Sequence, residues 1–274
     1  MAFIQASLQF PEYFISTRVQ LYFPTDLPPE VGNEVRGVIT LLHGLGNSSS
    51  EWFHYSAACR YAADNGFVLV VPEVGNSFCN NMRYGAPWHT ILTQLLPAQL
   101  RKIFQLPIQR EQNFVAGLSM GGYGAFLLAL SRPDLYAAAG SFSAPLDVTG
   151  MAPYPKADHL TPFLTPVFGE DLLLPPEANL NQLAQSVAVL PSKEQPRLYA
   201  TCGKEDDTHG ISESNCRFKA LADKLHLDFT FDEWHGTHEW NYWDRSLAQF
   251  IGFILNNNYG TKKRDDWSTP GLFE

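Results

Sequence analysis

The sequence has no long apolar run and few cysteines. No stretch reaches the roughly 18 to 20 apolar residues that a membrane-spanning helix requires. The first residues, MAFIQASLQFPEYF, lack the basic-then-apolar order of a secretory signal peptide. The four cysteines are widely spaced and form no C-x-x-C pair, so neither a zinc site nor a dense disulfide framework is predicted. We therefore expect a cytoplasmic protein without a membrane span, with free thiols that are buried or half-buried.

Positive charge is also scarce. Lysine and arginine number 19 against 28 aspartates and glutamates, which gives a formal net charge of -9. Such a surface repels nucleic acids and anionic membranes, so neither is an expected partner. Hydrophobic residues, in contrast, make up 45% of the chain, which is enough for a sizeable core. The composition predicts a globular protein, and the sequence leaves open whether copies of the chain form a homo-oligomer.

Strand and helix signals alternate along most of the chain. Apolar runs rich in Val, Ile, Phe and Tyr predict strands at residues 19–23, 37–42, 67–71, 114–117, 137–142, 198–202 and 229–231. Helical periodicity covers residues 51–64, 91–104, 121–130, 180–190, 213–225 and 242–255. This alternation predicts an α/β fold, a mostly parallel central sheet with helices on both faces. Two further segments, around residues 4–10 and 18–23, have no helix between them and are expected to form an antiparallel hairpin at the sheet edge.

One segment departs from this alternation. Residues 144–190 contain seven prolines, too many for a continuous helix or a central strand. We expect an irregular, lid-like insertion at about residues 145–190 inside a single domain that spans residues 1–258. A linker between two domains is less favoured, because the strands predicted near residues 198 and 229 complete the same sheet. Residues 259–274 are expected to be a C-terminal tail.

A G-x-S-x-G motif lies between a predicted strand and a predicted helix. It runs from Gly117 to Gly121 with Ser119 at its centre. A bare motif of this kind also occurs in glycine-rich turns, but a strand before it and a helix after it are the context of the nucleophile elbow in the α/β-hydrolase fold. The serine then stands at a helix N-terminus, where amide groups stabilise developing negative charge. The motif predicts Ser119 as a nucleophile.

An H-G-x-G loop follows the strand predicted at residues 37–42. Its glycines, Gly44 and Gly46, let the backbone approach a bound acyl group. We expect the backbone amides of Leu45 and Met120 to form the oxyanion hole. His43 is expected to hydrogen-bond this loop rather than act as a base, because in this architecture the base follows a late strand.

A carboxylate and an imidazole are expected on loops after late strands, in the order Ser, Asp, His. The loop after residue 202 offers Glu205, Asp206 and Asp207, and spacing alone does not choose among them. The loop after residue 231 offers His235 and His238. These two histidines could also be an H-x-x-H metal pair, but no third ligand is evident, so neither a metal nor another cofactor is predicted.

The motifs resemble those of the tributyrin-esterase branch of the esterase D family. The similar blocks are GLSMGGYGAF at 117–126, LLHGLGN at 41–47, CGKED at 202–206 and GTHEWNYWD at 236–244, with the weaker NNMRYG at 80–85. The resemblance implies a triad of Ser119, Asp206 and His238, with the amides of Leu45 and Met120 as oxyanion donors. It also implies hydrolysis of short acyl esters, including acetyl groups on sugars. The proline-rich insertion and the tail depart from the family pattern.

These expectations describe a serine carboxylesterase that works through an acyl-enzyme. The alternatives on the same triad are an S-formylglutathione hydrolase-type thioesterase and an acyltransferase, and a less favoured one is a non-catalytic binding module with this fold. His43 and Gly44 are expected to border the substrate pocket. So are aromatic side chains near the active-site loops, each of which could equally fill the core: Tyr84, Trp88, Trp234, Trp240 and Trp243.

Overall fold

The chain forms an eight-stranded sheet in the order β1-β2-β4-β3-β5-β6-β7-β8. The computed structural model describes residues 1–29, 31–32, 34–148, 160–257 and 259. The strands are β1 (Ala2–Phe10), β2 (Ile15–Phe23), β3 (Gly37–Leu42), β4 (Phe67–Pro72), β5 (Asn113–Leu118), β6 (Ala138–Phe142), β7 (Arg197–Gly203) and β8 (Phe229–Trp234). Neighbouring strands from β4 through β8 are parallel, whereas β1 and β2 form an antiparallel hairpin at one edge. The predicted α/β fold and its edge hairpin are confirmed.

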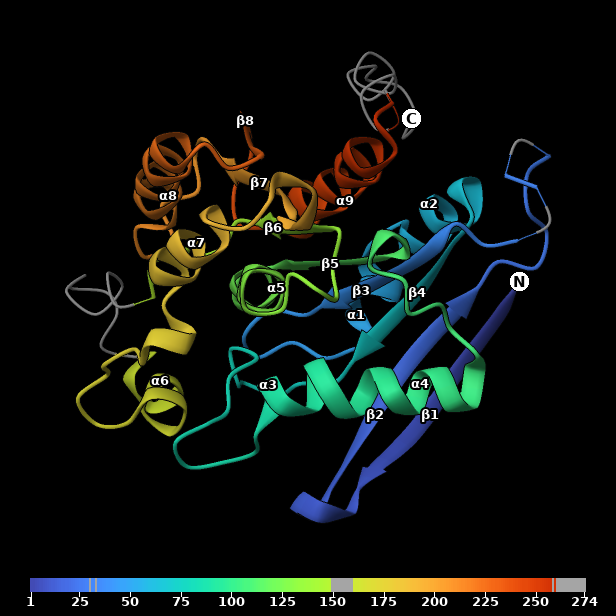
Figure 1. Cartoon of the computed structure of the whole chain (residues 1–274), viewed down its shortest axis with the longest axis horizontal. Helices are drawn as coiled ribbons and strands as arrows, with labels where there is room; N and C mark the ends of the chain where they lie inside the picture. The colour runs from blue at the N-terminus through green and yellow to red at the C-terminus, as the bar shows by residue number, and fades with distance from the viewer. Residues whose placement is uncertain (30, 33, 149–159, 258, 260–274) are drawn as a thin grey trace, which may run out of the picture.

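Helices cover both faces of this sheet (Figure 1). They are α1 (Glu51–Tyr55), α2 (Ala58–Asn65), α3 (Trp88–Thr90), α4 (Leu96–Phe104), α5 (Met120–Ser131), α6 (Thr161–Phe168), α7 (Leu180–Ala188), α8 (Ile211–Leu225) and α9 (Trp240–Leu255). One apolar cluster joins α4, α5, α7 and α8 to the sheet, and a second joins α1, α2 and α9 to the other face. Strands β3 and β5 therefore lie between two apolar layers, which explains their nearly continuous apolar sequences.

The single helix predicted at residues 51–64 is two helices. The chain breaks at Ser56, whose backbone is extended. The carboxylate of Asp244 accepts hydrogen bonds from the backbone N–H of Ala57 at 2.7 Å and from the hydroxyl of Tyr61 at 2.7 Å. Asp244 thus supplies an acceptor for a backbone donor at the start of α2. The break depends on a residue of α9 that is 187 positions away from Ala57.

The predicted helix at residues 91–104 begins with a π-helical turn, Ile91–Leu95, before α4. Pro97 has no N–H to donate to the carbonyl of Thr93, four residues earlier. The guanidinium of Arg132 donates to that carbonyl at 3.4 Å. We attribute the local widening of the helix to Pro97, since π turns and kinks are common where the ordinary hydrogen-bond ladder is interrupted.

The proline-rich insertion is more regular than its composition predicted. Helix α6 lies inside it, with Pro162 in the first turn and Pro166 in its interior. The prediction of an irregular segment is therefore wrong at residues 161–168. Proline is tolerated in a first turn, and the carbonyls of Pro166 and Val167 accept hydrogen bonds from the backbone N–H groups of Tyr84 and Arg83, each at 2.9 Å. These bonds fasten α6 to the loop after β4; residues 149–159 lie outside the described part of the chain.

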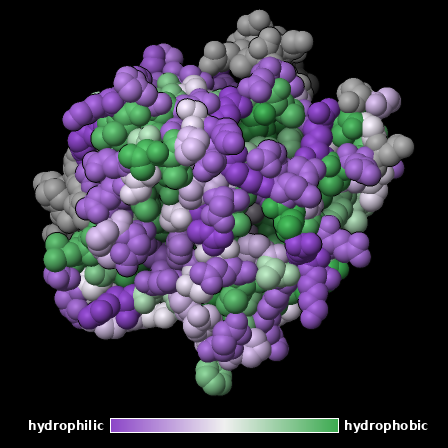
Figure 2. Space-filling view, in the orientation of Figure 1, coloured by the Kyte–Doolittle hydropathy of each residue, from purple (hydrophilic) through white to green (hydrophobic). Residues whose placement is uncertain are grey.

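The structure describes the first residue of the predicted tail and all four cysteines. Tyr259, the first residue of the predicted tail, donates a hydrogen bond to Asp64 at 3.0 Å, and residues 260–274 lie outside the described part of the chain. All four cysteines are free thiols; Cys216 is exposed, contrary to expectation. Among the described residues, no helix combines the length and the apolar character needed to cross a membrane. Hydrophilic and hydrophobic residues are interspersed over the face shown in Figure 2.

Candidate active site

Ser119 occupies the tight turn between β5 and α5. Its backbone has a positive φ of 51°, which is unusual for a residue other than glycine and is typical of strained functional turns. A Cβ atom added to Gly117 would lie 2.4 Å from the backbone of Gly121. One added to Gly121 would lie 2.4 Å from the carbonyl oxygen of Leu42. Both flanking glycines are therefore required by close backbone contact.

His238 lies in the loop between β8 and α9 and reaches Ser119. Its Nε2 atom is 3.1 Å from Oγ of Ser119. The ring of Trp243, in the first turn of α9, meets the imidazole at 88° with the ring centroids 5.0 Å apart. This edge-to-face contact restricts rotation of the imidazole. Of the two histidines that the sequence left as candidates, the structure brings this one to the serine.

Asp206 lies on the other side of the same imidazole. Its Oδ2 atom is 2.9 Å from Nδ1 of His238, and its Oδ1 atom accepts a hydrogen bond from the N–H of Thr208 at 3.2 Å. Burial by itself raises the pKa of the carboxyl, but the hydrogen bonds from His238 and Thr208 outweigh it and leave the pKa lowered. Since a carboxylate only accepts, Nδ1 carries the proton and Nε2 of the neutral ring can accept the hydroxyl proton of Ser119.

Glu205, the residue before Asp206, joins the two loops that carry the acid and the histidine. Its Oε2 atom accepts the N–H of Gly236 at 2.7 Å, and its Oε1 atom lies 2.6 Å from Nδ1 of His235. These two contacts lower the pKa of the Glu205 carboxyl. The loops also touch directly, because a Cβ atom at Gly203 would lie 2.1 Å from the carbonyl oxygen of Gly236. Sequence reasoning had left Glu205 only as an alternative acid.

The loop after β3 passes beside the serine. The N–H of Asn47 donates to the carbonyl of Gly44 at 3.2 Å, and the N–H of Gly46 donates to the side chain of Asn76 at 2.8 Å. A Cβ atom at Gly44 would lie 3.6 Å from Cβ of Ser119 and 2.7 Å from the side-chain oxygen of Asn47. A side chain at Gly44 would thus collide with this loop, and the backbone there approaches the nucleophile closely.

The amides of Leu45 and Met120 belong to this loop and to the turn of Ser119. Met120 is the first residue of α5, where backbone N–H groups have no partner within the helix. Among the described residues, neither amide donates a hydrogen bond to another protein group. Both amides therefore remain available to a ligand next to Ser119.

His43 is buried below the loop and hydrogen-bonds it. Its Nδ1–H donates to the carbonyl of Gly44 at 2.9 Å, and its Nε2 atom accepts the backbone N–H of Val74 at 3.1 Å and lies 3.0 Å from Oε1 of Glu73. Burial raises the pKa of Glu73, but its contact with the imidazole of His43 and the hydrogen bond from the N–H of Ser49 dominate and lower the pKa to about 2. Sequence reasoning missed Glu73. The available signal was its position directly after β4, at the carboxyl edge where the other site residues also lie.

The described residues include no group of three or more metal-ligating side chains. The two histidines of the H-x-x-H pattern face different carboxylates, His235 facing Glu205 and His238 facing Asp206. That arrangement does not converge the two imidazoles on one ion, and the serine, imidazole and carboxylate are instead ordered for proton transfer.

A family model matches almost the whole chain. The model, the Esterase family with the description "Putative esterase", matches residues 15–254. The chain belongs to this esterase family. The esterase is 24% identical over 263 residues to an acetyl esterase of Caldicellulosiruptor saccharolyticus, covering 90% of this chain and 96% of that protein.

Solved structures agree with this assignment. The fluorophosphonate-binding serine hydrolase FphF of Staphylococcus aureus superimposes with a TM-score of 0.80 at 25% identity, covering 93% of the esterase and 99% of that chain. An S-formylglutathione hydrolase from the same organism gives a TM-score of 0.77 at 26% identity, with the same coverage of both chains. The predicted fold and the prediction of a carboxylesterase are confirmed.

The aromatic residues predicted to border the pocket of the esterase lie in different places. Trp240 packs edge to face against Trp243 and against Trp52, with ring centroids 5.3 Å apart in both pairs. Trp240 therefore packs against Trp243, the residue whose ring contacts His238. Trp234 is buried and stacks on Tyr242 with centroids 4.5 Å apart, which makes it part of the core.

Tyr84 contacts the insertion, whereas Trp88 contacts the apolar core. Tyr84 is 55% exposed, and its hydroxyl donates to Glu170 at 2.9 Å. Trp88 begins α3 and packs against the apolar cluster beneath α4 and α5. The structure thus brings Ser119, His238 and Asp206 into hydrogen-bond contact, whereas these two aromatic residues connect the loop after β4 to the insertion and to the core.

Proposed function

We propose that this esterase hydrolyses short-chain acyl esters with Ser119 as nucleophile, His238 as base and Asp206 as the group that orients the base. One observation carries the proposal: His238 makes hydrogen-bond contacts on both sides. Its Nε2 atom lies 3.1 Å from Oγ of Ser119, and its Nδ1 atom lies 2.9 Å from Oδ2 of Asp206. A hydroxyl is a weak nucleophile at neutral pH, so it needs an adjacent base in a fixed tautomer. The lowered pKa of Asp206 keeps that carboxyl ionised and able to hold the tautomer.

The first half of the reaction forms an acyl-enzyme. Oγ of Ser119 attacks the ester carbonyl carbon while Nε2 of His238 takes the hydroxyl proton. The carbonyl electrons move onto oxygen, and the amides of Leu45 and Met120 donate to that oxyanion. When the tetrahedral intermediate collapses, the bond to the alcohol oxygen breaks and the imidazolium returns the proton to the leaving alcohol. Asp206 stabilises the imidazolium in between.

The second half repeats these steps with water. Nε2 of His238 takes a proton from water, the hydroxide oxygen attacks the acyl carbon, and the same two amides hold the oxyanion. Collapse releases the carboxylic acid and returns the proton to Oγ of Ser119. The route requires no metal and no organic cofactor.

The substrate class rests on resemblance and on a relative. The motifs resemble the tributyrin-esterase branch, and a relative covering most of the chain is an acetyl esterase. Both support acyl groups of few carbons, with acetyl esters of sugars among the substrates. A series of p-nitrophenyl esters from acetate to palmitate tests this: kcat/KM should be highest for the short chains, and a maximum at the long chains would overturn the assignment.

The nucleophile is tested by covalent labelling with a fluorophosphonate. The wild type should be labelled and Ser119→Ala should not. Cys216→Ser provides a control, because Cys216 is an exposed nucleophile on α8 and its loss should leave labelling unchanged. Labelling that persists in Ser119→Ala would refute the assigned nucleophile, and no labelling of the wild type would favour a non-catalytic binding protein.

A thioesterase that acts on S-formylglutathione is the second candidate. It is favoured by the structural neighbour with that activity in its name, at 26% identity and a TM-score of 0.77. The same triad would cleave the thioester, with a thiol leaving in place of an alcohol. Comparing kcat/KM for S-formylglutathione and for p-nitrophenyl acetate decides between them, and adding alcohols as competing acceptors detects acyl transfer.

A further inference from the structure

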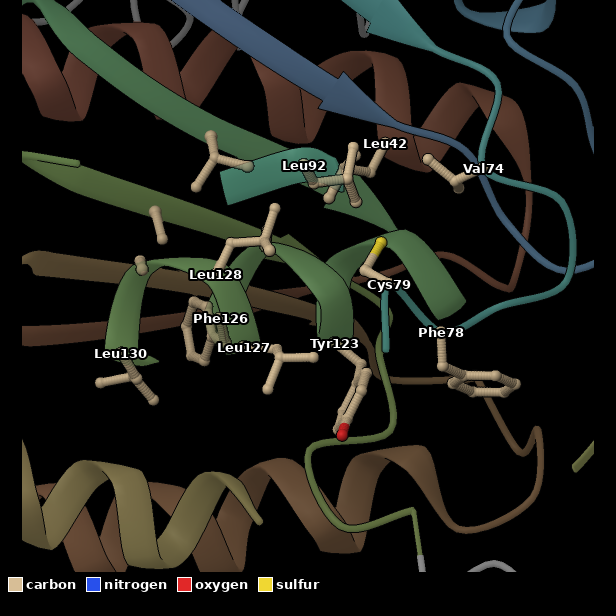
Figure 3. Close-up of a cluster of buried hydrophobic side chains, with 14 of the residues drawn as sticks. Leu42, Val74, Phe78, Cys79, Leu92, Tyr123, Phe126, Leu127, Leu128 and Leu130 are labelled. Carbon is tan, nitrogen blue, oxygen red and sulfur yellow. The ribbon is translucent and has the colours of Figure 1, made fainter. Parts of the chain in front are cut away.

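A cavity lies between α4, α5 and the sheet, apart from the residues of the proposed triad. Its volume is about 80 Å³, room for several water molecules at roughly 10 to 15 Å³ each. Its walls are mainly apolar and include Val38, Val70, Leu92, Leu96 and Leu128. Figure 3 shows Leu92 and Leu128 in the same layer of side chains, one from the π-helical turn and the other from α5. Such a space is unusual beside a core, where side chains normally close-pack.

Thr40, in the middle of β3, lines this cavity. The strand pairs with β4 on one side and β5 on the other, so a residue at this position is normally covered by helices. Val38 and Leu42, two residues before and after, are buried in the apolar cluster on the same face, whereas Thr40 is only half-buried. Its hydroxyl makes no hydrogen bond to any other described residue, which follows if α4 and α5 leave a gap above it.

Tyr136 supplies a second hydroxyl. The residue follows α5, lines the cavity and is 6% exposed. Within the described part of the chain its hydroxyl has no hydrogen-bond partner. The hydroxyl oxygen is not completely shielded from solvent. The little exposure that Tyr136 retains therefore includes its hydroxyl. A hydroxyl at the edge of an apolar cavity gains from a hydrogen-bond partner, so a ligand that supplies one is favoured.

We propose that this cavity binds a small neutral amphiphile with a short hydrocarbon body and one hydroxyl group. The apolar walls match the hydrocarbon, and Thr40 and Tyr136 can each donate to or accept from the ligand hydroxyl. None of the residues that line the cavity is charged. A carboxylate or an ammonium group would meet no charged side chain in the cavity wall, which disfavours an ionic ligand. Ile108, 51% exposed, borders the cavity and marks its opening to solvent.

The test uses 1-pentanol as the probe and 1,5-pentanediol as the matched control, since the second hydroxyl of the diol would have to enter the apolar end. Ligand-observed NMR should show that pentanol binds more tightly than the diol. Thr40→Val and Tyr136→Phe keep the shape of the cavity and should each weaken pentanol binding about 3- to 10-fold, the effect of one hydrogen bond. Activity toward p-nitrophenyl acetate should not change in Thr40→Val.

A filling variant, Thr40→Leu, should abolish binding and raise the Tm, because the longer side chain occupies the cavity. If Thr40→Leu does not fold, the two hydroxyl-deletion variants decide. A crystal soaked with pentanol should show the alcohol between α4 and α5. Equal affinity for pentanol and the diol, unchanged affinity in both deletion variants, or pentanol bound only beside Ser119 would overturn the proposal.

Discussion

The carboxylate of Glu205 accepts a hydrogen bond from the backbone N–H of Gly236 at 2.7 Å. Asp206 follows directly after Glu205, and His238 comes two residues after Gly236. The contact therefore connects the loop that carries the proposed acid to the loop that carries the proposed base. A change of a few tenths of an ångström in this connection would alter the contact between Asp206 and His238, and hydrogen bonds of this kind depend steeply on geometry.

Glu205→Gln should lower kcat/KM about 3- to 10-fold, because a neutral amide accepts the N–H of Gly236 more weakly than a carboxylate does. Asp207→Asn is the matched control: it removes one negative charge on the other side of Asp206, from an exposed side chain that no hydrogen bond ties to the histidine loop. It should leave kcat/KM nearly unchanged. Equal losses in the two variants would attribute the effect to charge alone.

Glu73 should make stability depend on pH below neutrality. Its pKa of about 2 in the folded protein lies below the ordinary glutamate value of 4.5. The contribution is therefore complete above about pH 4.5 and is lost as the pH falls toward 2, with an upper bound of about 3 kcal/mol. Urea unfolding at pH 3 and pH 7 should show a smaller difference for Glu73→Gln than for the wild type.

Glu12→Gln, which changes an exposed glutamate at the hairpin tip, serves as the control for the loss of a carboxylate. It should keep the pH dependence of the wild type. If Glu73→Gln keeps it as well, the hydrogen bonds of Glu73 to the loop after β3 do not contribute to stability.

A backbone substitution tests whether the amide of Leu45 is an oxyanion donor. Leu45→Pro deletes the amide of residue 45 and should lower kcat about 10²- to 10³-fold, the effect of one such donor in comparable enzymes. Leu45→Ala keeps the amide and should have a small effect. Circular dichroism and Tm control for misfolding of the proline variant. Similar kcat values in the two folded variants would exclude the amide of Leu45 as a donor.

The strands that lead to the site could be predicted from the sequence because they are apolar on both faces. The prediction at residues 37–42 coincides with β3, and the one at residues 114–117 lies within β5. Their order also followed from general rules for parallel sheets. What could not be predicted depends on contacts far apart in sequence, such as Asp244 breaking the helix at Ser56, or the backbone donors of residues 83–84 completing α6.

In the candidate site, too, some features could be predicted from local sequence and others depend on distant contacts. The elbow around Ser119 has a local signature, because its glycines are required by contacts within a few residues and with β3. No local signature distinguishes Glu205, Asp206 and Asp207, since all three are carboxylates in one turn. It depends on which side chain turns inward: Asp206 is buried against His238, whereas Glu205 points to Gly236. Here the family resemblance selected the residue that the geometry brings to the histidine.

The most direct test of the account is the kinetic coupling between Ser119 and His238. We predict that Ser119→Ala and His238→Ala each lower kcat for p-nitrophenyl acetate about a million-fold, and that the double variant loses little more than either single variant, because the base acts only through the nucleophile. Losses that multiply in the double variant, or a Ser119→Ala enzyme with activity close to the wild type, would contradict the proposed triad.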